Sequence, residues 1–275
     1  MDSIKLLVTL NEHYLPQLQV MLTSINHTNP REIFSIYLVH KSLSESDLAP
    51  LRRQCELFGY TLHPITVDAS LFANAPLTRN YPQEMYYRLL AGQILPPELD
   101  RILYLDPDTL VLNALRPLWE TDLSGNLFAA AAHTGKTELA NSVNQIRLGT
   151  QHNYYNSGVL LIDLAAARTE IKPQEIFSYT EAHAKELLFP DQDLLNILYG
   201  TRILELDDSI WNYDARNYNN YFLRSAGACT VDWVMNHTAV LHFCGKAKPW
   251  KEGYFHRFGV LYKHYARLTD LLLNE

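Results

Sequence analysis

Three apolar runs near the N-terminus decide the fold: Ile4-Lys-Leu-Leu-Val-Thr-Leu10, Ile33-Phe-Ser-Ile-Tyr-Leu-Val39 and Thr61-Leu-His-Pro-Ile-Thr-Val67. Each run has the length and the apolar or β-branched content of a strand. Between them, residues 15–26 repeat apolar side chains at helical spacing, and residues 44–58 read as a helix that Ser44 caps. Strands that alternate with helices form a parallel sheet with right-handed crossovers. The sequence therefore predicts an α/β fold.

The rest of the chain continues this alternation less regularly. Further strands are expected at residues 101–105, 127–132, 158–164 and 239–243, and helices at residues 85–94, 173–188, 191–199 and 254–273. Residues 211–222 are polar and aromatic without a clean period, so we interpret them as a loop. We expect one α/β domain with a mostly parallel central sheet, flanked by helices and followed by a C-terminal helix.

The composition limits the possible function classes. The 275 residues are 47% hydrophobic and 19% charged, with a net charge of −7, which argues against a disordered chain and against a general nucleic-acid binder. The sequence has no apolar run of about 18 residues that could span a membrane, and no secretory signal. Its three cysteines are widely spaced and fit reduced thiols better than disulfides. We therefore expect a cytoplasmic protein.

Positive charge gathers at the C-terminal end. Residues 246–275 hold six basic and three acidic residues, whereas the preceding part of the chain is acidic on balance. A basic, aromatic segment of this kind can contact an anionic membrane from its inner face. A solvated terminal helix is the alternative interpretation.

Asp106-Pro107-Asp108 is the first motif that carries chemistry. In extended chain, residues two apart point to the same side, so both carboxylates can hold one divalent cation. They follow the expected strand 101–105, and open α/β sheets bind ligands at the carboxyl ends of their strands. A capped turn is the alternative for an isolated pair. Neither Gly-x-Gly-x-x-Gly nor Gly-x-Ser-x-Gly occurs in the chain.

The stretch from His242 to Trp250 adds three groups that suit a metal-bound phosphate. His242 ends an apolar strand and can complete a carboxylate metal site. Gly245 lets the backbone approach a phosphate closely, and Lys248 can neutralise a diphosphate. A surface loop with solvated lysines is the alternative.

Polar groups in the middle of the chain suit a sugar. Asn156 and Ser157 precede a buried strand and offer paired donors and acceptors. Asp191 can accept from a ligand hydroxyl or cap the helix that follows it. Arg88 can face a phosphate or a carboxylate, or lie on a helix surface.

Taken in order, these motifs resemble glycosyltransferase family 8, which includes bacterial lipopolysaccharide galactosyl- and glucosyltransferases and glycogenin. The resemblance runs from residue 4 to about residue 250. The segments that carry it are residues 9–14, 86–89, 103–108, 156–159, 191–193 and 242–250.

The resemblance implies a GT-A fold, which is Rossmann-like, over residues 1–250. Residues 1–110 would be the nucleotide-binding half, residues 111–250 the acceptor and sugar half, and residues 251–275 a basic, aromatic helix. It also implies a UDP-sugar donor and Mn²⁺ or Mg²⁺. The implied metal ligands are Asp106, Asp108 and His242; the nucleotide and diphosphate residues are Thr9, Asn11, His13, Asp106, Pro107, Gly245 and Lys248; and the donor-sugar residues are Arg88, Asn156, Asp191 and Gln192.

The implied reaction moves glucose or galactose from UDP to a hydroxyl of a glycan, glycolipid or glycoprotein, with retention at the anomeric carbon. Asp191 and Gln192 are the candidate catalytic residues. Retaining glycosidases use a carboxylate nucleophile, but an amide such as that of Gln192 is a poor one, so we expect front-face attack. A sugar-nucleotide nucleotidyltransferase, a non-catalytic UDP-sugar scaffold or sensor, and a self-glycosylating primer protein are the alternatives.

Overall fold

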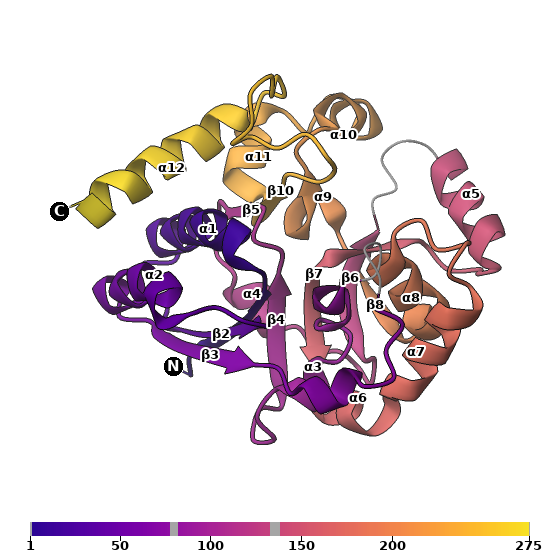
Figure 1. Ribbon diagram of the computed structural model, residues 1–275. Helices are drawn as coiled ribbons and strands as arrows, with labels where there is room; N and C mark the ends of the chain where they lie inside the picture. The colour runs from indigo at the N-terminus through magenta and orange to yellow at the C-terminus, as the bar shows by residue number, and fades with distance from the viewer. Residues whose placement is uncertain (1, 78–81, 133–137, 275) are drawn as a thin grey trace.

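The computed structural model describes residues 2–77, 82–132 and 138–274 as an α/β fold with one large sheet and one small sheet (Figure 1). The large sheet has the strand order β3-β2-β1-β4-β7-β6-β8, and the small sheet has the order β5-β10-β9. The strands are β1 Ile4–Thr9, β2 Phe34–His40, β3 Thr61–Thr66, β4 Arg101–Leu105, β5 Thr109–Val111, β6 Phe128–Ala132, β7 Tyr155–Asp163, β8 Ile203–Leu206, β9 Tyr213–Asp214 and β10 Val240–His242.

Helices lie on both faces of the large sheet. They are α1 Leu15–Thr28, α2 Glu45–Phe58, α3 Ala91–Ile94, α4 Arg116–Trp119, α5 Glu138–Leu148, α6 Leu164–Glu170, α7 Pro173–Ala182, α8 Pro190–Tyr199, α9 Asp208–Trp211, α10 Tyr218–Arg224, α11 Val231–His237 and α12 Gly259–Asn274. The helix α12 packs along α1, where the Thr269 hydroxyl donates to the Thr23 hydroxyl over 2.7 Å (Figure 1).

The predicted parallel sheet is confirmed. Strand β1 pairs in parallel with both β2 and β4, β2 with β3, and β6 with β8, whereas β7 runs antiparallel to β4 and β6. The predicted strand 101–105 matches β4. The predicted cap at Ser44 is also confirmed, because Ser44 and Asp47 form a reciprocal capping box at the start of α2.

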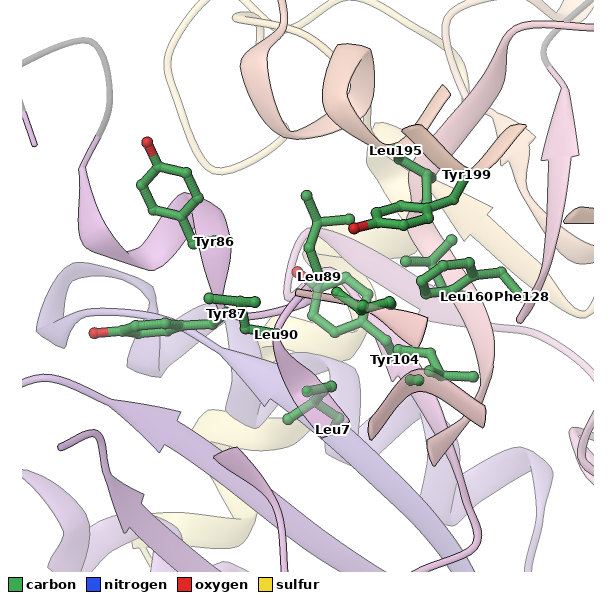
Figure 2. Packing of buried hydrophobic residues seen from close by; sticks show 14 of the residues in the cluster. Leu7, Tyr86, Tyr87, Leu89, Leu90, Tyr104, Phe128, Leu160, Leu195 and Tyr199 are labelled. Atoms are coloured by element: carbon green, nitrogen blue, oxygen red, sulfur yellow. The ribbon is translucent and has the colours of Figure 1, made fainter. Parts of the chain in front are cut away.

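Alternation along the strands divides the core between the two faces of the sheet. In β7, Leu160 packs with α3, α6, α7 and α8, whereas its neighbour Leu161 packs with α1, α2 and α4. Figure 2 shows the first of these clusters, in which Tyr104 of β4 lies among Leu7, Leu89 and Leu160. Both faces of β4 are thus buried, and only its carboxyl end can present polar groups to a ligand.

Two predicted elements are wrong in detail. Residues 85–94 are not one helix: a 3-10 helix at Gln83–Tyr86 and the short helix α3 flank a turn at residues 87–90. Successive side chains from Met85 to Leu90, except Arg88, are buried, so the segment has no solvent-facing stripe to impose helical periodicity. The helix expected to reach residue 188 ends at Ala182, and the backbone N–H groups of Leu188 and Phe189 donate to the Asp193 carboxylate instead of to a helical carbonyl.

Residues 211–222 are not simply a loop. They contribute the end of α9, the strand β9 and the start of α10. Tyr213 stacks on Tyr221 with ring centroids 4.0 Å apart, and both side chains are buried. This tertiary stacking orders a stretch that has no local periodicity.

Candidate active site

The candidate site lies where β4 ends and the chain turns through residues 106–108 into β5. Asp106 and Asp108 follow the last residue of β4, and His242 ends β10, which pairs with β5. Asp106 and Asp108 border a cleft of ≈ 300 Å³ that is also lined by Thr9, Asn11, Tyr14, Arg88 and Pro107, and His242 is buried next to these two carboxylates. The predicted clustering at the carboxyl end of the strand is confirmed.

Asp106, Asp108 and His242 can each point a ligand atom at one common position. Their ligand atoms lie within 4.8 Å of one another. His242 Nε2 is 3.3 Å from Asp108 Oδ1 and 3.8 Å from Asp106 Oδ2. Two carboxylates and an imidazole suit a divalent cation such as Mn²⁺.

Gly158 keeps this position open. A Cβ at residue 158 would lie 2.3 Å from His242 Cε1 and 2.7 Å from Asp106 Oδ2. The absence of a side chain therefore lets two predicted ligands converge, and the three residues fit a metal ion.

The charges in the site are strongly coupled. Burial acts to raise the pKa of Asp108, but nearby His242 and Lys248 outweigh it and hold that pKa well below its usual range. Burial acts to lower the pKa of His242, but Cys244 and Asp108 outweigh it and raise that pKa well above its usual value. Asp108 and its cationic neighbours thus stabilise one another's charged forms.

The Lys248 side chain is largely shielded from solvent beside Asp108. Its ammonium pairs with Asp108 and donates to the backbone carbonyl of Phe243 over 2.8 Å, and its side chain is only 11% exposed. The alternative of a solvated surface lysine is therefore wrong. Gly245 has φ +83°, and the Arg216 guanidinium occupies the space of its missing side chain, with Nη1 2.3 Å from where a Cβ would stand. The positive φ favours glycine at residue 245, and a larger residue would also have to displace the Arg216 guanidinium.

Arg88 contacts both a predicted metal ligand and a predicted donor-sugar residue. Its Nη1 lies 3.2 Å from Asp106 Oδ1 and 3.0 Å from Asp191 Oδ2, and its side chain is 13% exposed. It also lies over the Tyr104 ring, with Cζ 4.7 Å from the centroid. It is not an ordinary surface arginine, since it faces two carboxylates.

The predicted donor-sugar residues come together at the start of α8. Asp191 is the second residue of that helix, whose N-cap is Phe189, so Asp191 is not its cap. The Ser157 hydroxyl donates to Asp191 Oδ2 over 2.9 Å, and Asn156 Nδ2 donates to Gln192 Oε1 over 3.0 Å.

The predicted nucleotide residues near the first strand, Thr9, Asn11 and His13, divide into two groups. Thr9 and Asn11 line the cleft, and Asn11 Oδ1 accepts from the backbone N–H of His13 over 3.1 Å. The His13 side chain is 79% exposed and lies outside the described lining of the cleft. Its predicted contact with the nucleotide therefore has no support from the geometry.

Sequence analysis missed Tyr104 and Asn212. The Tyr104 hydroxyl donates to Asp106 Oδ1. Its position two residues before Asp106 is a signal that alternation along a strand could have revealed. Asn212 contacts His242 and Asn156 from within the stretch interpreted as a loop, and nothing local in the sequence marks it.

A sequence comparison decides the family. The family described as "Glycosyl transferase family 8" matches residues 5–253. The chain belongs to glycosyl transferase family 8. The predicted family is thereby confirmed, and the protein is a glycosyltransferase.

Relatives and solved structures agree with this membership in glycosyl transferase family 8. General stress protein A of Bacillus subtilis is 26% identical over 268 residues, which cover 94% of this chain and 91% of the relative. A lipopolysaccharide 1,2-glucosyltransferase of Escherichia coli K12 is 28% identical over 250 residues, covering 86% and 70%. An active-site mutant of LgtC superposes with a TM-score of 0.80 at 25% identity, covering 96% of both chains. The chain therefore has the predicted GT-A fold.

Proposed function

We propose that this glycosyltransferase moves a hexose, glucose or galactose, from UDP to an acceptor hydroxyl, in a metal-dependent reaction that retains the anomeric configuration. The observation that carries the proposal is the convergence of Asp106, Asp108 and His242, two of which, Asp106 and Asp108, line the ≈ 300 Å³ cleft. The printed descriptions of similar proteins add support: one solved structure is the galactosyltransferase LgtC with donor and acceptor sugar analogues, and several relatives are lipopolysaccharide glucosyltransferases.

The diphosphate would bind beside the three ligands. Asp106, Asp108 and His242 would hold Mn²⁺ or Mg²⁺, which supplies Lewis acidity for the departing diphosphate. Lys248 lies next to Asp108 and would add positive charge where negative charge develops. Gly245 would let the backbone approach the phosphates, since it carries no side chain.

The nucleoside would lie over the first strand and the residues that follow it. Thr9, Asn11 and Pro107 line the cleft and would contact it. This arrangement fits a nucleotide-binding half at residues 1–110 and a sugar and acceptor half at residues 111–250.

The donor hexose would lie among Arg88, Asn156, Asp191 and Gln192. Asp191 is a poor candidate for a nucleophile, because Arg88 neutralises its carboxylate and Ser157 donates to it. Gln192 carries an amide, which is less nucleophilic still. Front-face attack fits this arrangement best, with the leaving phosphate oxygen taking the proton of the acceptor hydroxyl.

The C-terminal segment would hold the enzyme at the inner face of an anionic membrane, close to a glycolipid acceptor. Lys251, Arg257 and Lys263 are exposed on it, and the Phe255 side chain is 83% exposed. Among the described residues, no helix combines the length and apolarity that crossing a bilayer requires. Co-sedimentation with vesicles that contain phosphatidylserine, compared with neutral vesicles, tests this contact.

The reaction is tested by incubating the enzyme with Mn²⁺, UDP-glucose or UDP-galactose and a panel of glycosides. The proposal predicts UDP release with one of the two donors and an α-linked product from the α-linked donor. A product of inverted configuration, or a glycosyl adduct trapped on Asp191, would refute the mechanism. An increase in the mass of the enzyme itself would indicate self-glycosylation instead.

A further inference from the structure

A continuous chain of side-chain hydrogen bonds joins a predicted metal ligand to a predicted donor-sugar residue. His242 Nδ1 lies 2.9 Å from Asn212 Oδ1. Asn212 Nδ2 donates to Asn156 Oδ1 over 2.8 Å, and Asn156 Nδ2 donates to Gln192 Oε1 over 3.0 Å. Asn212 stands between the two regions of the site and is fully buried.

A backbone N–H sets the direction of this chain. The N–H of Gly158 lies 2.9 Å from Asn156 Oδ1, and a backbone N–H can only donate. Asn156 must therefore turn its oxygen toward Gly158 and Asn212, and its NH₂ group toward Gln192. Asn212 then turns its own NH₂ group toward Asn156 and its oxygen toward His242, so His242 carries a proton on Nδ1.

This chain of hydrogen bonds fixes the orientation of two side chains that the proposed reaction uses, His242 and Gln192. With one proton fixed on Nδ1, the ring nitrogen that faces Asp106 and Asp108 is Nε2, and it is this nitrogen that would give up its proton to bind a metal. With the Asn156 amide facing it, the Gln192 amide keeps one orientation in the donor-sugar region.

We propose that Asn212 is a positioning residue that orients both His242 for the metal and, through Asn156, Gln192 for the donor sugar. The inference rests on the proposed function, since it assigns Asn212 a role within that site. Asparagine alone satisfies both neighbours at this length: aspartate accepts from His242 but cannot donate to Asn156, and alanine does neither.

Two substitutions separate the two links. Asn212→Asp keeps the acceptor for His242 and places a second oxygen against Asn156 Oδ1. We expect Mn²⁺-dependent UDP affinity within about threefold of wild type and turnover of UDP-hexose lowered about 10–100-fold. Asn212→Ala removes both links, so we expect turnover and metal affinity to fall, each by about 10–100-fold.

Asn29→Asp is the matched control. Asn29 is also buried, and it accepts from the backbone N–H of Leu115 at the far end of α1, outside the site. It should lower thermal stability while UDP affinity and turnover per folded molecule stay as in wild type. Equal losses of metal affinity in the Asp and Ala variants of residue 212, or full turnover in either, would overturn the proposal.

A measurement on the metal-free protein distinguishes failure of this inference from failure of the proposed function. With ¹⁵N-labelled histidine, wild type and Asn212→Asp should show a slowly exchanging Nδ1–H proton of His242, and Asn212→Ala should not. If the proton is absent in wild type, the positioning role is wrong whatever the protein binds. If the proton is present but UDP does not bind with Mn²⁺, the proposed function fails, and the role of Asn212 in it fails too.

Discussion

Gly158→Ala should close the metal position from the side. The added Cβ would lie 2.3 Å from His242 Cε1, 2.7 Å from Asp106 Oδ2 and 3.0 Å from Asn156 Oδ1. Carbon atoms in contact ordinarily stay about 3.5–4.0 Å apart. The imidazole or the backbone of β7 must therefore move by about 1 Å, and His242 is buried and held by Asn212.

A movement of this size is large for a metal site. Ligand distances are defined within about ±0.2 Å, so a shift of about 1 Å removes His242 or Asp106 as a ligand. Since changing the groups that merely orient a ligand costs about 10–100-fold in affinity, we expect Mn²⁺-dependent UDP binding to weaken by about 100-fold or more, or about 2.8 kcal/mol. Overpacking should also lower the free energy of unfolding by about 1–3 kcal/mol.

Calorimetric titration of UDP in the presence of Mn²⁺ measures this loss. The control is Gly92→Ala, whose Cβ would lie 3.0 Å from the backbone nitrogen of Arg168, between α3 and α6. It should reduce stability but leave UDP affinity unchanged. Wild-type affinity in Gly158→Ala would refute the assignment of His242 and Asp106 as ligands.

Three further predictions test the fold and the site. Ser44→Ala removes the capping box of α2 and should lower the free energy of unfolding by about 1 kcal/mol in urea titrations; an unchanged midpoint would contradict the cap. Burial acts to raise the pKa of Asp193, but Arg147 and Tyr154 outweigh it, so the pKa is lowered in the folded state. The stability from this group is therefore present above the ordinary carboxyl pKa of about 3.9 and is lost as the pH falls through the lowered value. Asp193→Asn should lower the free energy of unfolding by about 3 kcal/mol at pH 7 and reduce its dependence on pH below about pH 4. An unaltered pH dependence would show that the pairing of Asp193 with Arg147 is not responsible. Gln192→Ala should reduce turnover much more than UDP affinity, and equal losses would contradict its place beside the donor sugar.

Sequence analysis correctly predicted those helices and strands that have a clear local signal, such as an apolar run or a capping residue. The strand at 101–105 follows from a short apolar run that ends at Asp106, and the start of α2 follows from Ser44 with Asp47 three residues later. The carboxyl-end rule then places Asp106 and Asp108 at the ligand edge. These predictions require only residues that are close together in the sequence.

Tertiary contacts determined the parts that were missed. Residues 211–222 are ordered by the stacking of Tyr213 on Tyr221. The periodicity of the sequence does not predict this contact. The sequence did not decide whether Arg88 faces a ligand or lies on a helix surface, because its partners Asp106 and Asp191 come from distant parts of the chain. Asn212 is the clearest case, because its role depends on two partners 30 and 56 residues away.

The most direct test of the central claim is the binding of UDP, measured by calorimetry with and without Mn²⁺ in wild type and Asp108→Asn. Asp108 is buried between His242 and Lys248 at the predicted metal position. The account predicts that wild type binds UDP only with Mn²⁺ and that Asp108→Asn, although folded, does not bind it. Wild-type binding that is equally strong without metal, or that survives in Asp108→Asn, would contradict the metal site on which the proposed function rests.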